Sequence, residues 1–278
     1  MDFYKGTIPI IETDKPATDL SRPSGVSYGY VPRDYSQFPQ TMFASPSEMN
    51  VIPRSEWDAR YDEQERTASS LEHIYLSGPG GSPAFVNLDQ DGHGYCWAYS
   101  TGHAIMLDRL RQNLPLVRLN PHAAAACIKE GRDEGAWSGL SAQWARNYGY
   151  AVEGTGVGEW PLHSRDLRHE TPELLAAMKL HRVTEDFVDL TQEVWNQNLT
   201  EAQVATQLFL NNPCPVDFNH WGHAVCGVRW VRIEPGDWGI LILNSWKGWG
   251  RHGLGVLRGS KRTPNGAVCV RASTPSVA

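Results

Sequence analysis

The chain has 278 residues, 41% of them hydrophobic, and a formal net charge of −6 at pH 7. This length suits one large domain with an extension, or two small domains, and allows a sizeable hydrophobic core. The negative charge argues against general binding to nucleic acids or anionic membranes, and no apolar run approaches the roughly 18 residues that span a bilayer, so we expect neither partner.

Residues 1–50 differ in composition from the rest of the chain. They contain six of the 18 prolines and show no helical or alternating period, which predicts an extended arm. The start lacks the positive segment and apolar block of a signal peptide, so we expect none. A disordered tail is the alternative, but five aromatic residues favour an arm that docks on a surface, such as that of a protein partner: Tyr28, Tyr30, Tyr35, Phe38 and Phe43.

Residues 51–278 have the pattern of a globular domain that begins with helices. Apolar spacing predicts a helix from Cys96 or Trp97 to about Gln112. Asn120 as N-cap, Pro121 at the first helical position and Gly131 as the stop predict the next helix. Three more helices are expected: from Ser138 as N-cap to Gly149, from Thr171-Pro172, and from a capping box of Thr200 and Gln203.

After Pro213 the pattern changes to strands. Five short segments are rich in β-branched or aromatic residues and are separated by Gly, Pro, Asn or Asp: 215–218, 224–231, 238–244, 253–259 and 267–273. Helices first and strands later is typical of an α+β fold. A cleft between the helical half and the β half is a natural place for a functional site.

The five cysteines are an odd number at scattered spacings. They are Cys96, Cys127, Cys214, Cys226 and Cys269, and this pattern favours a cytoplasmic or other reducing compartment over a disulfide framework.

The run "QDGHGYCWAYS" (90–100) contains a candidate nucleophile. Glycines at 92 and 94 allow a sharp turn, and Cys96 then opens a helix, whose dipole stabilises a thiolate. His223, at the start of an apolar strand, is the candidate base, and Asn244, at the end of the next strand, can orient its ring. Gln90 and the Cys96 backbone N–H can form an oxyanion hole. Together these residues make a complete acyl-transfer site.

With these motifs in place, the sequence resembles the papain-like cysteine proteases. "QDGHGYCWAYS" is similar to the family's Gln-x-x-Cys-Gly-x-Cys-Trp-Ala-Phe-Ser run, "GHAVCGV" (222–228) to its His-Ala-Val strand, and "NSWKGWGRHGLGVLRG" (244–259) to its Asn-Ser-Trp block. "VIPRSEWDAR" (51–60) resembles the start of the family's mature domain. The likeness covers roughly residues 52–275.

The resemblance implies an α+β, two-lobed fold, with a helical left lobe, an antiparallel, β-barrel-like right lobe and the active site in the cleft between them. It implies a peptidase acting on peptide or protein substrates without cofactor or metal. The catalytic residues that it implies are Cys96, His223, Asn244 and Gln90. It also implies a set of substrate-binding residues around them, with Trp137 as a wall of the pocket for the second residue before the scissile bond and Trp246 shielding the His–Asn hydrogen bond: Gly135, Ala136, Trp137, Gly222, Ala224 and Trp246.

The sequence departs from the family in three places. His93 replaces a cysteine that usually forms a disulfide. The connection before His223 is cut to "NHWG" (219–222), which removes much of one pocket wall. The first 50 residues are too short, and wrongly patterned, for the family's helical inhibitory propeptide.

Other readings of the same residues stay open. A Cys-His₃ zinc site of Cys96, His93, His220 and His223 is formally possible. A calcium loop over 87–98 lacks the glutamate required at its last position and is rejected. Cell-wall amidases and transglutaminase-like enzymes are alternatives for the substrate only. A second function class is a papain-like fold used as a structural or interaction subunit of a large assembly, for example a virion.

Overall fold

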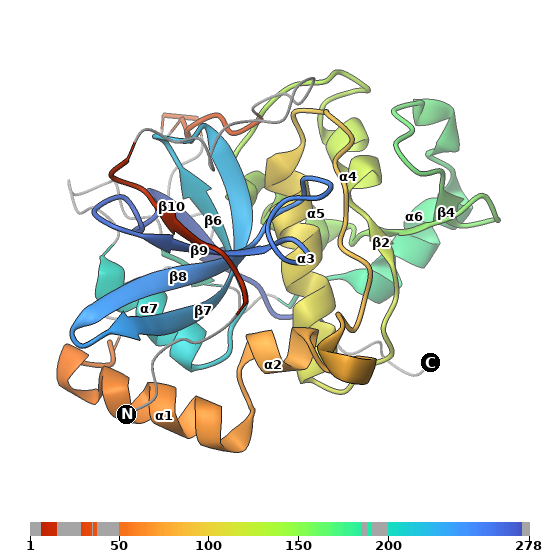
Figure 1. Ribbon diagram of the computed structural model, residues 1–278. Coiled ribbons are helices and arrows are strands. Elements are labelled where there is room, and N and C mark those ends of the chain that lie inside the picture. Colours follow the sequence, from red (N-terminus) through yellow and green to blue (C-terminus); the bar gives the residue numbers. More distant parts are fainter. Residues whose placement is uncertain are drawn as a thin grey trace.

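The computed structural model describes residues 7–15, 29–34, 36–37, 50–184, 188–190 and 200–273. A mixed α+β arrangement places a large sheet on one side and most of the helices on the other, with α3 between them (Figure 1). The helices of the described chain are α1 (Trp57–Thr67), α2 (Leu71–Tyr75), α3 (Cys96–Arg111), α4 (Pro121–Ile128), α5 (Ser138–Asn147), α6 (Pro172–Met178) and α7 (Glu201–Phe209). Short 3₁₀ turns lie at Arg54–Glu56, Pro79–Gly81, Leu167–His169 and Lys179–His181.

The predicted helix starts are largely confirmed by their caps. The Asn120 side chain accepts a hydrogen bond from the His122 N–H, and that of Thr171 accepts one from the Leu174 N–H. The predicted capping box of Thr200 and Gln203 is present. These side chains satisfy backbone donors that a helix start leaves unpaired.

The predicted N-cap of α5 is wrong by one residue. Trp137 is the N-cap, and Ser138 is already helical. The Ser138 hydroxyl donates to Asp217 Oδ1 at 2.5 Å instead of capping the helix. A long-range partner therefore outcompetes the local role that the sequence suggested.

Helix α3 is the central element of the fold. Every residue from Cys96 to Arg109 is buried. The helix packs against β6 (Cys214–Phe218) and β7 (His223–Glu234) on one side and against α4 and α5 on the other. Cys96, its first residue, therefore lies where the helical half meets the sheet.

The large sheet has the order β1-β9-β8-β7-β6-β10-β5. Its remaining strands are β1 (Ile10–Glu12), β5 (Val188–Asp189), β8 (Asp237–Leu243), β9 (Leu254–Arg258) and β10 (Gly266–Cys269). All five strands predicted after Pro213 are present. In the described residues β1 and β5 form the two edges, so the sheet is open there and the expected barrel-like lobe is not confirmed. A small second sheet joins β2 (Leu119–Asn120), β3 (Ala151–Glu153) and β4 (Glu159–Trp160).

Parts of the N-terminal segment pack on the same chain. Strand β1 pairs in parallel with β9, from Ile10 opposite Val256 to Glu12 opposite Arg258. Further along, Tyr30 pairs in parallel with Ala136. The other aromatic residues expected to dock the arm, Tyr28, Tyr35, Phe38 and Phe43, lie outside the described residues.

The cysteine pattern argued against a disulfide framework, but the structure contains one disulfide. Cys214 and Cys269 form a disulfide between β6 and β10. Their strands pair antiparallel with Ala267 opposite Val216, and continuing this register brings the two cysteines face to face. Cys96, Cys127 and Cys226 are free. The cysteine pattern therefore no longer favours a reducing compartment.

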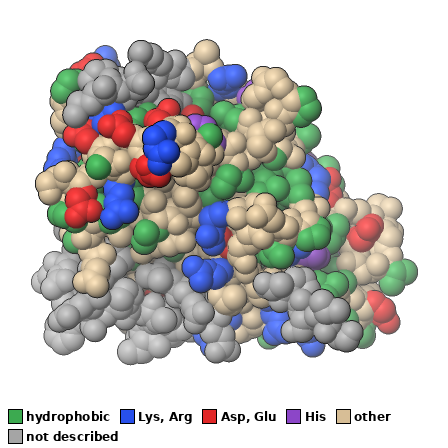
Figure 2. All heavy atoms as spheres, turned by 90° about the horizontal axis from the view of Figure 1, so that it is seen from below, with side chains coloured by type: hydrophobic (Ala, Val, Ile, Leu, Met, Phe, Trp, Pro, Cys, Tyr) green, Lys and Arg blue, Asp and Glu red, His purple; other side chains and the backbone are tan. Residues whose placement is uncertain are grey.

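No described helix is both long and apolar enough to cross a bilayer. Figure 2 shows acidic and basic side chains interspersed on one face of the molecule. Such a face has no extended field of one sign.

Buried histidines make the stability of the fold dependent on pH. Burial lowers the pKa of His103 to about 3, with a smaller contribution from Arg118. Burial also lowers the pKa of His181 to about 4 and that of His122 to about 2. Between pH 4 and 6.5 the unfolded chain binds protons that these neutral rings do not, so the free energy of unfolding rises with pH in this window.

We expect His103→Gln to reduce this pH dependence. Removing one such group should lower the slope by about one proton, or roughly 1.4 kcal/mol per pH unit. Glutamine can still accept the hydrogen bond that the Leu88 N–H donates to His103 Nε2. Urea unfolding at several pH values from 4 to 6 measures the slope directly, and an unchanged slope would show that His103 titrates normally in the folded protein.

Candidate active site

Cys96 is placed by a tight turn followed at once by a helix. Gly92 in this turn has a φ of +79°, a conformation that suits glycine. The Gly94 N–H donates to Asp133 Oδ1 at 2.7 Å, and the Gly94 carbonyl accepts from the Trp97 indole at 3.1 Å. These contacts fix both sides of the nucleophile candidate, and Cys96 itself is fully buried.

His223 and Asn244 form the pair predicted from the sequence. His223 is the first residue of β7, and Asn244 directly follows β8, the neighbouring strand. The distance from His223 Nε2 to Asn244 Oδ1 is 2.8 Å. A neutral ring that donates from Nε2 leaves Nδ1 as a proton acceptor, and within the described residues Nδ1 has no hydrogen-bond partner.

Asn244 is held by contacts that sequence reasoning missed. Its backbone N–H donates to the Gly253 carbonyl at 2.8 Å, and its carbonyl accepts from Asn87 Nδ2 at 2.8 Å. Asn87 precedes Gln90 by three residues, so the two halves of the site are joined through it. In the sequence, the only hint of this role was that residue 87 is an asparagine.

Two tryptophans surround the histidine ring. The ring of Trp246 stacks on that of His223 with centroids 4.2 Å apart, and the ring of Trp221 meets it edge-on at 4.7 Å. Both indoles are buried. They keep water from the His223–Asn244 hydrogen bond, which is the place that the resemblance implied for Trp246.

Gln90 is also buried, and it links the turn before Cys96 to the segment after Asn244. Its Nε2 donates to the His93 carbonyl at 2.5 Å, and its Oε1 accepts from the Ser245 hydroxyl at 2.7 Å. The Gln90 N–H donates to the Ser245 carbonyl at 3.0 Å. One amide hydrogen of Gln90 remains for another acceptor.

The N-terminal segment crosses the residues expected to bind substrate. The Gly29 carbonyl accepts from the Ala136 N–H, and the Ala136 carbonyl accepts from the Val31 N–H, both at 2.9 Å. The Tyr30 N–H donates to the Gly222 carbonyl at 3.3 Å. Gly135 also lies against this segment: a Cβ atom added to Gly135 would be only 2.6 Å from the Gly29 carbonyl oxygen.

In this covered arrangement the nucleophile candidate is protonated. Burial raises the pKa of Cys96 to about 12, while the N–H groups of Ala224 and Gly29 act in the opposite direction. Burial also lowers the pKa of His223 to about 4, and its hydrogen bond to Asn244 partly offsets this. The thiol and the imidazole are therefore both neutral, in contrast to the thiolate that a helix start alone would favour.

Two acidic residues near the site were not singled out from the sequence. Asp217 on β6 accepts from the Ser138 hydroxyl and from the Ser138 N–H, and burial raises its pKa to about 7. Asp189 on β5 pairs with Arg33 of the N-terminal segment at 2.7 Å. The signal for Asp217 was a charged residue inside an otherwise apolar predicted strand.

The alternative zinc site is not assembled. The His93 ring packs against that of His122 with centroids 4.6 Å apart, and the His220 ring packs against Phe218. Among the residues that the structure describes, no group of three His, Cys, Asp or Glu side chains converges to hold a metal ion.

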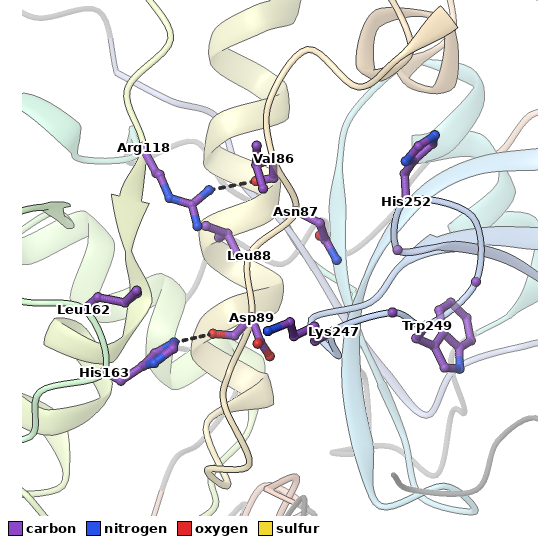
Figure 3. Close-up of a pocket in the computed structure, with 13 residues that line it drawn as sticks. Val86, Asn87, Leu88, Asp89, Arg118, Leu162, His163, Lys247, Trp249 and His252 are labelled. Carbon is purple, nitrogen blue, oxygen red and sulfur yellow. Dashed lines mark hydrogen bonds between the residues drawn. The ribbon is translucent and has the colours of Figure 1, made fainter.

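An open cavity of about 520 Å³ lies beside the site and not at Cys96. It is bounded by residues 86–89, by the loop from Lys247 to Gly253, and by Arg118 and His163. Figure 3 shows Lys247 pointing toward Asp89, whose carbonyl is 2.9 Å from His163 Nε2. The catalytic candidates Cys96, His223, Asn244 and Gln90 are not among the residues that line it.

Comparison with known proteins identifies the fold but not the chemistry of the site. No protein-family model and no curated protein matches the chain. The solved structure of xylellain, a cysteine protease from Xylella fastidiosa, gives a TM-score of 0.59 at 15% identity, covering 92% of this chain and all of that one. Digestive procathepsin L 3 from the larval midgut of Tenebrio molitor gives 0.50 at 14% identity, over 85% of this chain and 97% of that one. The fold is papain-like.

A third structure has the same papain-like fold in a longer chain. The proform of the ragweed pollen protease Amb a 11 gives a TM-score of 0.50 at 16% identity, over 68% of this chain. The match covers 62% of that proform, so this chain spans less than two thirds of it. At 14–16% identity these structural matches show the fold alone.

Proposed function

We propose that the chain is a cysteine peptidase that hydrolyses peptide bonds through an acyl-thioester on Cys96. The observation that carries this proposal is the hydrogen bond between His223 Nε2 and Asn244 Oδ1, made beside Cys96. The Ala224 N–H faces the Cys96 sulfur. Since Ala224 directly follows His223, this contact puts Cys96 next to the pair. A buried imidazole with one nitrogen fixed and the other open is suited to take a proton from a thiol.

The reaction has two stages. His223 Nδ1 takes the Cys96 proton, the sulfur attacks the peptide carbonyl, and the same proton passes to the leaving amine as the C–N bond breaks. Water then attacks the thioester with His223 as base, which releases the acid and restores the thiol. Gln90 and the Cys96 N–H stabilise the oxyanion of each tetrahedral intermediate, and Asn244 holds the imidazole in place.

The substrate backbone binds where residues 29–31 now lie. Ala136 offers both of its backbone groups to the N-terminal segment, and Gly222 offers its carbonyl. An incoming peptide uses the same groups, with Gly135, Ala224 and the indoles of Trp137 and Trp246 around it. The described chain is therefore a latent form, and two of the similar structures are likewise a proform and a procathepsin.

A second candidate is a structural or interaction subunit of a larger assembly such as a virion, with little or no proteolysis. The covered, neutral Cys96 favours this candidate. The arm favours it as well, because it could bind a partner protein instead of the cleft of its own chain. Against it stands the complete set of catalytic groups, which a scaffold does not need.

Labelling with an epoxide inhibitor of papain-like proteases, read by intact mass, separates the two candidates. A peptidase gains one adduct on Cys96 at neutral pH, and Cys96→Ala gains none. Cys127 and Cys226 serve as internal controls, because they are free thiols outside the proposed site. If folded protein stays unlabelled both with the native arm and with Arg33→Glu, the structural role is the better account.

A further inference from the structure

Arg33 of the N-terminal segment fills a buried acidic pocket beside the substrate-binding residues. Its Nη1 lies 2.7 Å from Asp189 Oδ2, and the two side chains are 2% and 0% exposed. The guanidinium also lies over the Trp137 ring, 4.5 Å from the centroid. A planar cation that pairs with a carboxylate and stacks on an indole fits this pocket in shape and in charge.

A second carboxylate stands on the same face of the sheet. Strand β10 lies between β5 and β6, with Val268 opposite Asp189 and Gly266 opposite Asp217. Paired residues point to the same side of a sheet, and so do residues two apart on one strand. Asp189 and Asp217 therefore share one face, and the repulsion between them helps to raise the pKa of Asp217.

The pocket is also close to the proposed point of cleavage. Trp137 follows Ala136, whose backbone holds residues 29–31, and the Gly29 N–H faces the Cys96 sulfur. A substrate whose backbone pairs with Ala136 thus presents a nearby side chain to Trp137. When the arm leaves, that side chain takes the place of Arg33 next to Asp189.

We propose that Asp189, beside Trp137, selects substrates with a basic side chain, arginine above all, in the pocket that the resemblance assigns to the second residue before the scissile bond. This inference rests on the proposed function for its biological meaning. The pocket itself can be tested without catalysis. An arginine gains the ion pair and the stacking that Arg33 makes now, whereas an aliphatic side chain leaves a buried carboxylate without that cation.

The test measures binding of two capped peptides that differ only in arginine or leucine at this residue. Calorimetry uses the full chain with Arg33→Ala and Cys96→Ala, so that the pocket is empty and nothing is cleaved. We expect the arginine peptide to bind about 10- to 100-fold more tightly, as expected for a hydrogen bond to a charged group. Adding Asp189→Asn should reduce this preference to less than about 3-fold, while Asp166→Asn, which alters a partly exposed carboxylate paired with Arg168, should preserve it.

Each outcome decides the inference. Equal or tighter binding of the leucine peptide overturns it, and so does an arginine preference that survives Asp189→Asn in protein with an unchanged melting temperature. Hydrolysis of the same peptides by the chain with Arg33→Ala alone is measured separately. If neither is cleaved, the proposed peptidase activity fails, whereas the binding result still decides the role of Asp189.

Discussion

Arg33→Glu should raise the rate at which an epoxide inhibitor labels Cys96 by about 100-fold or more, because breaking a buried ion pair costs roughly 3–5 kcal/mol. The new carboxylate faces Asp189, so the arm loses an attraction and gains a repulsion. The segment then leaves the cleft more often, and Cys96 is exposed for more of the time. Stopped reactions analysed by intact mass give the labelling rate.

Two variants control this result. Arg33→Lys keeps the positive charge and should increase the rate much less. Arg54→Glu breaks an ion pair with Glu201 whose arginine is 52% exposed, away from the arm, and should leave the rate unchanged. Equal labelling of wild type and Arg33→Glu would contradict the covering role of residues 29–34, provided that both proteins melt at the same temperature.

Cys96→Ala, introduced together with Arg33→Glu, should lower peptide hydrolysis by at least about 10⁴-fold relative to Arg33→Glu alone, because removing a nucleophile disables the whole catalytic unit. The loss should appear in kcat, since the groups that hold the peptide backbone remain. A fluorogenic arginine-containing peptide at saturating concentration measures it.

The matched control is Cys226→Ala, which removes another buried free thiol from β7. It should retain activity close to that of Arg33→Glu. Asn244→Ala should give a smaller loss than Cys96→Ala, because His223 is still present but its ring is no longer fixed. Full activity in the Cys96→Ala protein would mean that another group performs the chemistry.

Local sequence patterns predicted much of the fold. Asn120, Thr171 and Thr200 cap the helices that they were expected to cap, and the five strands after Pro213 are present. These features depend on a few neighbouring residues, so a single sequence is enough to predict them. The positions of Cys96, His223 and Asn244 followed from their motifs, and the structure brings the last two into direct contact.

What the sequence did not reveal depends on contacts between distant segments. The disulfide requires the register of β6 against β10. The shifted start of α5 follows from Asp217, 79 residues further along the chain. The pairing of Arg33 with Asp189 joins residues 156 positions apart. No local period encodes such partners, which is why the path of the arm could not be predicted from its composition.

The attachment of β1 to the sheet edge has a consequence for how the cleft is opened. Strand β1 is fixed beside β9, so a segment 29–34 that left the cleft would remain covalently linked to a part of the chain that stays in place. A ligand that is covalently linked to its own binding site competes at a high effective concentration. Peptides must compete with this local reservoir, and their occupancy of the cleft rises with their own concentration. On the proposed function, opening of the cleft would then be reversible and would need no cut in the backbone.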